Sequence, residues 1–115
     1  MITVFTPTYN RGNLLNRLYQ SLCQQTYNDF EWIIVDDGST DGTQNIVSSL
    51  IIKHNNIQDS FSIRFLKKNN GGKHTAINLG VKYAEGDLFF IADSDDFLPK
   101  DSLQIAHEEW SNIKH

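Results

Sequence analysis

Four short apolar segments alternate with longer amphipathic ones along the chain. The apolar segments cover residues 2–6, 31–36, 62–66 and 87–92, and they are rich in β-branched and aromatic side chains. Runs of this length and composition are typical of buried β-strands. Pro7 follows the first run directly. Because proline donates no backbone hydrogen bond, we expect the first strand to end before it.

The segments between and after these strands have helical spacing. Apolar positions recur at Leu14, Leu15, Leu18 and Leu22 in the first segment and at Ile46, Val47, Leu50 and Ile51 in the second. This spacing predicts one helix over residues 13–25 and a second that begins at a cap near Thr40 or Asp41. A third helix is predicted over residues 73–84, and a last one after Pro99.

Strand and helix alternate four times, which predicts a Rossmann-like α/β fold with three layers, α/β/α, and a mainly parallel sheet. In such sheets ligands bind at the carboxyl ends of the strands. The polar motifs of this chain follow the four strands in turn, as "PTYNR", "DDGSTDGT", "NNGGKH" and "DSDD". The sequence therefore predicts that all four motifs contribute to a single site.

Composition narrows the class of protein. A chain of 115 residues with 39% apolar and 21% charged residues is typical of one soluble globular domain. The net charge of −4 argues against a nucleic-acid partner. The single cysteine, Cys23, cannot form an internal disulfide, and the first ten residues have no pattern of a cleaved signal. We therefore expect a cytoplasmic setting.

The "DSDD" motif places Asp93, Asp95 and Asp96 directly after the fourth predicted strand. Mg²⁺ and Mn²⁺ prefer carboxylate oxygens, so the motif is a candidate metal site. Side chains of an extended segment alternate, and we expect Asp93 and Asp95 to point to one side while Asp96 begins the turn. The alternative is a solvated acidic turn that ends in a helix cap.

The "DDGSTDGT" motif provides carboxylates at the end of the second strand. Asp37 could accept hydrogen bonds from the ribose or base of a nucleotide, as acidic residues do in dinucleotide-binding folds. The alternative is that these carboxylates bind the amides of their own turn. We expect that structural role for Asp41 and Thr43, and Asp36 is open to it as well.

The remaining two motifs are less specific. In "PTYNR", Tyr9 could stack on a nucleobase or simply pack, and Arg11 could balance phosphate charge or be an ordinary surface residue. "NNGGKH" is not a P-loop, because His74 stands where a Ser or Thr would hold magnesium. Its glycines still allow close approach of a ligand, and Lys73 adds positive charge at a predicted helix start.

Several conspicuous residues are interpreted as scaffold. We expect a buried or half-buried thiol at Cys23 and packing aromatics at Trp32 and Trp110. Lys67 and Lys68 are expected to be solvated.

Taken together, the motifs closely resemble those of family 2 glycosyltransferases, which have the GT-A fold. The matching stretches are "TPTYNR", "QQTYNDFEWIIVDDGSTDGT", "NNGGKHTAINLG" and "AEGDLFFIADSDD". They cover nearly the whole chain in the order and spacing of the family. The resemblance implies that residues 1–115 are the nucleotide-sugar-binding part of a glycosyltransferase domain whose acceptor-binding half is absent from this chain.

The resemblance also implies roles for residues. Such enzymes bind a nucleoside diphosphate sugar, most often UDP-linked, and transfer the sugar with inversion to the hydroxyl of a carbohydrate or glycolipid acceptor. Tyr9 would stack on or flank the base, Pro7 and Thr8 would line its pocket, and Asp37 would accept the base N–H. The other nucleotide-sugar-binding positions are Arg11, Lys73, Asp93, Ser94 and Asp96.

The implied cofactor is Mn²⁺ or Mg²⁺. Asp95 would ligate it through the diphosphate, and Asp93 would contact the ribose or a metal-bound water. The catalytic base of the family lies well beyond this motif, and we expect it beyond His115 in a longer enzyme. Glu108 and Glu109 are not candidates, since they fall on the last predicted helix. The chain alone should therefore bind donor without transferring sugar.

Two further expectations concern the chain and the full enzyme. A strand after Asp96 would lack its neighbour, and the open sheet edge would favour self-association. The full enzyme could carry a membrane-associating tail. Two other functions remain open: a non-catalytic nucleotide or metal-binding module, and a metal-dependent phosphatase. The phosphatase is disfavoured because Asp96 and Phe97 follow Asp95 where such enzymes have a Thr or Val two positions on.

Overall fold

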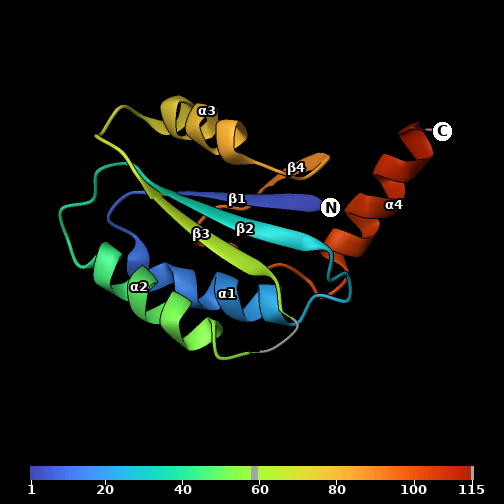
Figure 1. Ribbon diagram of the computed structural model, residues 1–115, viewed down its shortest axis with the longest axis horizontal. Coiled ribbons are helices and arrows are strands. Elements are labelled where there is room, and N and C mark those ends of the chain that lie inside the picture. The colour runs from blue at the N-terminus through green and yellow to red at the C-terminus, as the bar shows by residue number, and fades with distance from the viewer. Residues whose placement is uncertain (58–59, 115) are drawn as a thin grey trace.

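A computed structural model describes residues 1–57 and 60–114 of the chain (Figure 1). In chain order its elements are β1 (Ile2–Thr8), the short 3-10 helix η1 (Gly12–Leu14), α1 (Leu15–Cys23), β2 (Phe30–Asp36), α2 (Thr43–His54), β3 (Ser62–Lys67), α3 (Lys73–Tyr83), β4 (Leu88–Ile91) and α4 (Ser102–Lys114).

The four strands form one sheet in the order β3-β2-β1-β4. Every neighbouring pair is parallel, and Ile2 of β1 lies opposite Phe30 of β2 and Leu88 of β4. Helix α3 covers one face of the sheet, while α1 and α2 cover the other (Figure 1). The predicted three-layer α/β/α architecture with a parallel sheet is therefore confirmed.

The order of the strands creates a switch point between β1 and β4. The chain leaves β1 through α1 toward β2 and β3, and it returns through α3 on the opposite face to place β4 on the other side of β1. At such a point neighbouring connections diverge to opposite faces and leave a crevice at the carboxyl ends of the strands. This crevice is where a ligand site is expected.

Two apolar clusters hold the layers together, one on each face of the sheet. The larger lies under α1 and α2 and includes the fully buried Trp32, whose Nε1 donates to Thr6 Oγ1 at 2.9 Å. The smaller joins Phe5, Ile33 and Val35 to Ala76 of α3. Trp32 is thus the packing residue that the sequence predicts.

Strand β1 continues through Pro7 to Thr8, so the predicted end before Pro7 is wrong. Strand β4 reaches only as far as the position opposite Phe5, and beyond it β1 pairs with β2 alone. The Thr8 carbonyl faces β2 and accepts the Asp37 amide at 2.9 Å. Because alternate residues of a parallel strand bond to opposite sides, Pro7 faces the side without a neighbour, where a missing donor costs nothing.

The helix boundaries differ from the prediction at two amino ends. The first helix starts as η1, and α1 proper begins only at Leu15. The cap of α2 is Gly42 rather than Thr40 or Asp41. On α2 the buried positions include Val47 and Leu50, whereas Ile46 is exposed, so its predicted place on the inner face is wrong.

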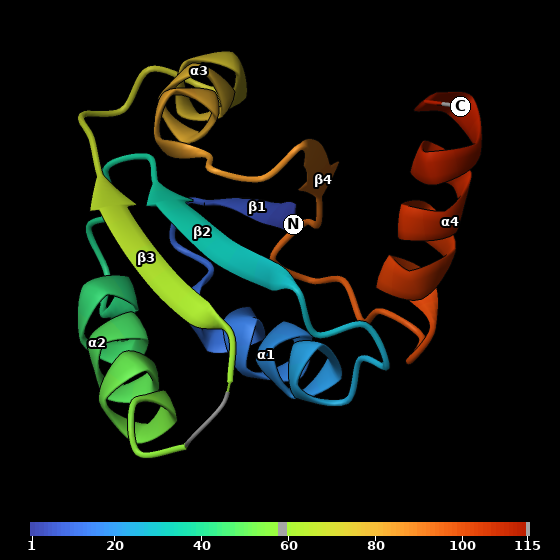
Figure 2. The same cartoon turned by 45° about the vertical axis from the view of Figure 1, so that its right-hand side comes forward.

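Helix α4 lies beside the sheet rather than in either helical layer (Figure 2). Leu103 is fully buried in the larger core cluster, and the ring of His107 stacks on Tyr27 with centroids 4.7 Å apart. Trp110 is half-buried and lines a hollow with residues at the starts of β1 and β4. Glu108 and Glu109 lie on an exposed part of α4 and do not line the cavity at the strand ends.

Residues 97–114 contain no strand, so the expected strand after Asp96 is not observed in this part of the chain. Among the described strands, the edges of the sheet are β3, which pairs only with β2, and β4, which pairs only with β1. No described helix is long and apolar enough to cross a membrane.

Candidate nucleotide-sugar and metal site

A cavity of about 410 Å³ lies at the carboxyl ends of the strands. Its lining residues are Pro7, Thr8, Tyr9, Arg11, Asp37, Lys73, Ala76, Asp93, Ser94 and Asp95. They come from the ends of β1, β2 and β4 and from the first turn of α3. The structure thus brings together every residue predicted for the site except Asp96, and it adds Ala76.

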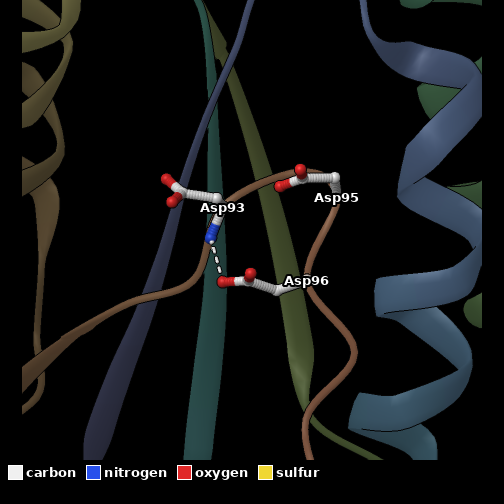
Figure 3. A group of neighbouring side chains, drawn as sticks. All are labelled: Asp93, Asp95 and Asp96. Atoms are coloured by element: carbon white, nitrogen blue, oxygen red, sulfur yellow. Dashed lines mark hydrogen bonds between the residues drawn. The ribbon is translucent and has the colours of Figure 1, made fainter.

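The acidic motif forms a tight loop after β4 (Figure 3). One carboxylate oxygen from each of Asp93, Asp95 and Asp96 lies within 4.8 Å of the others. The Asp96 amide donates to the Asp93 carbonyl at 3.0 Å, and the Asp93 amide donates to Asp96 Oδ2 at 2.8 Å. The loop turns at Ser94 and Asp95, so the expectation that the segment stays extended until Asp96 is wrong, but Asp93 and Asp95 do line the same cavity as predicted while Asp96 does not.

The loop is well suited to a hard divalent cation. Asp93 and Asp95 are exposed and line the cavity, whereas Asp96 is half-buried and uses one oxygen to hold the loop. Ser94 between them is buried. Carboxylate oxygens at this spacing, with those of Asp93 and Asp95 at the cavity, fit the chemistry of Mn²⁺ or Mg²⁺, which take carboxylates together with water and phosphate oxygens.

Lys73 provides positive charge beside the acidic loop. Its Nζ lies 3.4 Å from Asp93 Oδ1, and both side chains are more than half exposed, at 59% and 51%. An ion pair this open to solvent contributes little to stability. The pair therefore leaves both side chains available to a ligand that enters the cavity.

The segment after β1 presents Tyr9 and Arg11 at the mouth of the cavity. Both are exposed, and Tyr9 retains 43% of its accessible surface. Asn10 between them has a left-handed backbone with φ of 52°. Its amide donates to Ser39 Oγ at 2.8 Å, and its Oδ1 accepts the Thr40 amide at 2.9 Å. These bonds fix the turn that directs Tyr9 and Arg11.

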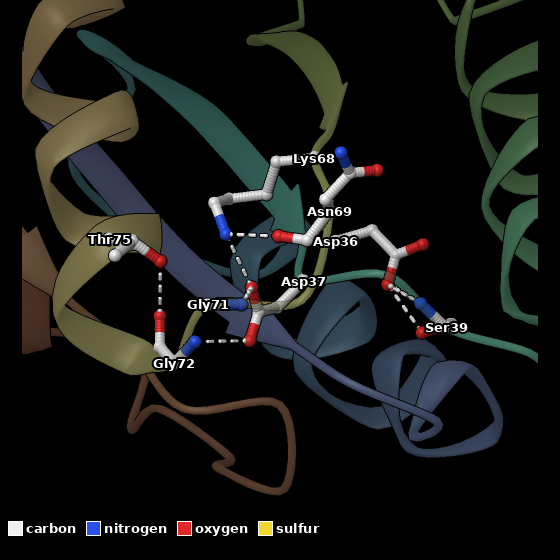
Figure 4. Close-up of polar contacts among 8 residues, drawn as sticks. All are labelled: Asp36, Asp37, Ser39, Lys68, Asn69, Gly71, Gly72 and Thr75. Carbon is white, nitrogen blue, oxygen red and sulfur yellow. Dashed lines mark hydrogen bonds and ion pairs between the residues drawn. The ribbon is translucent and has the colours of Figure 1, made fainter.

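Asp37 is held in a nearly closed polar network (Figure 4). Its Oδ1 accepts from Lys68 Nζ at 2.6 Å and from the Gly71 amide at 3.0 Å, and its Oδ2 accepts from the Gly72 amide at 3.0 Å. The Lys68 side chain is only 17% exposed and that of Asp37 only 11%. The expectation that Lys68 is solvated is therefore wrong, while Lys67 is exposed as predicted and donates to Gln44.

Two opposing effects set the pKa of Asp37. Burial removes water from the carboxyl group and raises its pKa, but the hydrogen bonds from Lys68, Gly71 and Gly72 lower it by more. The net pKa of Asp37 is below its ordinary value, so the group is ionised at neutral pH. An ionised carboxylate only accepts hydrogen bonds, so Asp37 can bind only groups that donate a hydrogen bond.

The other polar residues of the second motif serve the turn. Asp36 Oδ1 accepts both the amide and the hydroxyl of Ser39, and Asp41 Oδ1 accepts the amide of Thr43 at 3.0 Å and its hydroxyl at 2.6 Å. The predicted structural roles of Asp41 and Thr43 are confirmed, and Asp36, which the sequence left open, serves the turn as well. Among the described residues, Asp36 Oδ2 and Thr8 Oγ1 are buried without a hydrogen-bond partner.

Three buried polar residues escaped the sequence analysis. Glu31 accepts from the Thr3 hydroxyl, Gln25 binds the segment that follows the acidic loop, and His54 lies between the Tyr19 hydroxyl and the Phe61 carbonyl. The sequence around a polar residue does not show whether its side chain bonds to a buried partner or to water. The burial of these three residues is therefore seen only in the folded structure. Cys23 was expected to be buried or half-buried, but its side chain is exposed.

The fold and the site define the class of protein. A parallel α/β sheet with a cavity at its switch point and an acidic loop at the end of β4 is the arrangement of GT-A glycosyltransferases. Mannosyltransferase PcManGT from Pyrobaculum calidifontis, solved with GDP-Man and Mn²⁺, superposes with a TM-score of 0.82 at 28% identity, over 95% of this chain and 31% of its own. TarS 1–349 from Staphylococcus aureus, solved with UDP-GlcNAc, superposes with a TM-score of 0.78 at 32% identity, over 96% and 31%.

Sequence comparison gives the family. The profile of glycosyl transferase family 2 matches residues 3–115, and the chain belongs to that family. Glycosyltransferase GlyG of Streptococcus pneumoniae serotype 4 is 31% identical over 109 residues, which are 95% of this chain and 35% of GlyG. The chain thus spans about a third of the length of this curated relative.

Proposed function

We propose that the chain is the donor-binding part of an inverting glycosyltransferase, which transfers a sugar from a nucleoside diphosphate sugar to an acceptor hydroxyl. The observation that carries this proposal is the cavity at the switch point, where an aromatic ring, two cationic side chains and three carboxylates line one space. UDP is the favoured nucleotide, and the acceptor is a carbohydrate or glycolipid of polysaccharide or glycolipid synthesis, including that of the cell envelope. TarS solved with UDP-GlcNAc supports the choice of UDP.

The base and the phosphates would occupy opposite ends of the cavity. Tyr9 offers a ring face to the base, with Pro7 and Thr8 beneath it, and Asp37 accepts a base N–H. Arg11 and Lys73 balance the charge of the diphosphate.

The metal-binding end is the acidic loop. Asp95 would ligate Mn²⁺ or Mg²⁺, and Asp93 would contact the ribose or a metal-bound water next to Ser94. Asp96 holds the loop through the Asp93 amide. The chemistry supplied there is neutralisation of the negative charge that grows on the leaving diphosphate.

The transfer itself needs a base to deprotonate the acceptor hydroxyl. Among the described residues the cavity is lined by Asp37, Asp93 and Asp95 as its only carboxylates, and each already has a role in donor or metal binding. We therefore propose that the base and the acceptor site belong to another part of a longer enzyme. This chain alone would bind the donor and be inactive in transfer.

Two further proposals concern the surroundings of the chain. The open edge of β4 would favour self-association of two copies. The single, exposed Cys23 is consistent with a reducing, cytoplasmic setting, and membrane association would come from elsewhere in the full-length protein.

Calorimetric titration of UDP into the chain, with and without Mn²⁺, tests the proposed function. We expect binding that needs the metal and is lost in Asp95→Ala. Asp101→Ala is the matched control, because Asp101 is exposed and lies outside the cavity. Equal binding of UDP by wild type and Asp95→Ala in the presence of Mn²⁺ would contradict the assignment of the acidic loop.

A further inference from the structure

Lys68 lies next to the proposed nucleotide site, but neither the motifs nor the proposed function uses it. It extends from the loop after β3, and its ammonium group reaches Asp37 Oδ1 at 2.6 Å across 31 positions of sequence. Its Nζ also donates to the Asn69 carbonyl (Figure 4). With 17% of its side chain exposed, Lys68 is partly desolvated, which strengthens its bond to an ionised carboxylate.

The bonds to Asp37 leave one acceptor position for a further donor. A carboxylate has about four acceptor positions. Lys68 and the Gly71 amide take two on Oδ1, and the Gly72 amide takes one on Oδ2. Among the described residues nothing else donates to this carboxylate, and Asp37 lines the cavity. The position that remains for a ligand is therefore on Oδ2.

The network also restricts how Asp37 can move. The amides of Gly71 and Gly72 come from the turn that begins α3, whereas Lys68 is the first residue of the loop after β3. Gly38, with φ of 85°, lets the Asp37 loop approach this turn, since a Cβ there would lie 2.8 Å from the Asn70 nitrogen. The carboxylate is therefore held by residues at both ends of the loop between β3 and α3 before any ligand arrives.

We propose that Lys68 is a positioning residue that fixes Asp37 as an acceptor for the ring N–H of the base, and so restricts binding to nucleotides whose base carries a hydrogen on the ring nitrogen of its Watson–Crick edge. Uracil N3–H and guanine N1–H meet this requirement. Cytosine N3 and adenine N1 carry lone pairs there, which would face an ionised carboxylate. The inference rests on the proposed function, because it assumes that the base lies at Asp37.

Removing the ammonium group should weaken base recognition specifically. In Lys68→Met, Oδ1 loses its shortest bond and becomes open to water, so Oδ2 is no longer the single acceptor. We expect the affinity for UDP in the presence of Mn²⁺ to fall about tenfold, and the preference for UDP over CDP to fall with it. Lys67→Met is the matched control, because Lys67 is the adjacent lysine, is exposed and binds Gln44 instead. It should stay within about twofold of wild type.

The pH dependence of UDP binding separates positioning from general structural damage. Binding needs ionised Asp37, so it is lost as pH falls through the pKa of that carboxyl. Without Lys68 this pKa rises, and the acid limit of UDP binding should move to higher pH. The charged groups around Asp37 are Lys68, bonded to it, and Arg11, Lys73, Asp93 and Asp95, which line the same cavity. Only Lys68 is changed between the two profiles.

Pyrophosphate with Mn²⁺ is the probe that lacks a base. Calorimetry of UDP, CDP, GDP and pyrophosphate should show that Lys68→Met lowers affinity for UDP and GDP but leaves pyrophosphate unchanged. Lys68→Arg, which keeps the charge, should restore UDP binding, and Lys68→Gln, which keeps a donor without charge, should keep the shifted pH limit. The arginine and glutamine variants decide the question if the methionine variant does not fold.

Three results would overturn the inference. Lys68→Met could bind UDP within twofold of wild type with the same acid limit, or it could lose pyrophosphate and UDP in parallel. The wild type could also bind CDP as tightly as UDP. If the wild type binds neither UDP nor pyrophosphate, the proposed function itself fails and this inference with it. Binding of pyrophosphate but not UDP would spare the metal site and overturn the assignment of the base.

Discussion

Glu31 is a buried carboxylate in the sheet whose partners come from distant segments. Its Oε2 accepts from Thr3 Oγ1 at 2.6 Å and from the Glu85 amide at 2.7 Å. The Gly86 amide in turn donates to Thr3 Oγ1 at 2.9 Å. These bonds join β1, β2 and the turn before β4, so a single residue at this point affects three strands at once.

Gly86→Ala should disrupt this connection. A Cβ at Gly86 would lie 2.5 Å from the Thr3 backbone nitrogen and 2.8 Å from the Ile2 carbonyl carbon, and backbone atoms cannot move aside cheaply. We expect the free energy of unfolding to fall by about 1–3 kcal/mol, measured by urea denaturation.

Gly42→Ala is the control for this change. Nothing lies within 4 Å of a Cβ at Gly42, and its φ of −79° suits any residue. Its stability should stay close to that of the wild type. Equal stability of Gly86→Ala and wild type would show that the turn before β4 can shift without cost.

For single residues, the sequence predicted which side chains belong to the site better than it predicted which partners they contact. Asp37, Lys73, Asp93 and Asp95 do line one cavity, because their motifs follow neighbouring strands. Lys68 was misjudged since its partner is 31 positions away and its own surroundings in sequence are polar. Local sequence carries no record of such a partner, so its burial emerged only with the fold.

Among the contacts between elements, Gln25 joins the end of α1 to the segment that follows the acidic loop. Its Nε2 donates to the carbonyls of Pro99 at 2.8 Å and Ser21 at 3.1 Å, and its Oε1 accepts the Leu103 amide at 3.1 Å. One buried side chain thus caps the start of α4 and satisfies carbonyls on both sides of the joint. The position of α4 depends on it.

Gln25→Ala should therefore loosen α4 before the sheet. The change leaves a buried amide and buried carbonyls without partners, and we expect about 1–3 kcal/mol loss in the free energy of unfolding. Hydrogen exchange of the Leu103 amide should accelerate more than that of amides in β1.

Gln24→Ala is the matched control, because Gln24 is the adjacent glutamine and is exposed. It should change neither stability nor exchange. Exchange at Leu103 that is no faster in Gln25→Ala than in Gln24→Ala would mean that the packing of Leu103 and the stacking of Tyr27 on His107 hold α4 without Gln25.

Strands were predicted more accurately than helix starts for a physical reason. An apolar run between polar turns marks a buried strand by itself, and β2, β3 and β4 fall within two residues of the predicted ranges. A helix start depends on backbone geometry that several neighbouring residues can satisfy, as η1 and the Gly42 cap show. The Pro7 error has a tertiary cause, because it depended on where β4 stops.

In the described part of the molecule as a whole, the sheet has two edge strands, β3 and β4, and of the two only β4 carries an exposed large apolar side chain. Among the described strands β4 pairs only with β1, and its Ile91 is 46% exposed, as is Phe97 beyond the acidic loop. Exposed apolar strands at an edge favour pairing with a second copy. We expect concentration-dependent dimers in sedimentation velocity experiments.

Ile91→Lys should return the chain to a monomer, since a charge on an edge strand opposes such pairing. Ile52→Lys is the control, because Ile52 is also exposed but lies on α2, away from that edge. A wild type that remains monomeric at high concentration would contradict the prediction, and equal effects of the two variants would place the contact elsewhere.

The architecture could be predicted from the alternation of strands and helices, but the connection that follows the acidic loop could not. The order β3-β2-β1-β4 follows from right-handed connections and a single change of direction, and it places the four motifs together. The last helix was correctly predicted after Pro99, but the strand expected after Asp96 is not observed, because an irregular connection leads from the acidic loop directly to that helix. The structure shows helix α4 there.

The central position of β1 has a consequence for synthesis of the protein on the ribosome. Strand β1 is made first and gains β2 on one side early, but its other side is covered by β4, which is made only after residues 37–87. During that interval the nascent chain carries an unpaired, apolar strand edge of the kind that joins chains into aggregates. A pause in translation between β2 and β4 would therefore lower the yield of folded protein more than a pause after β4.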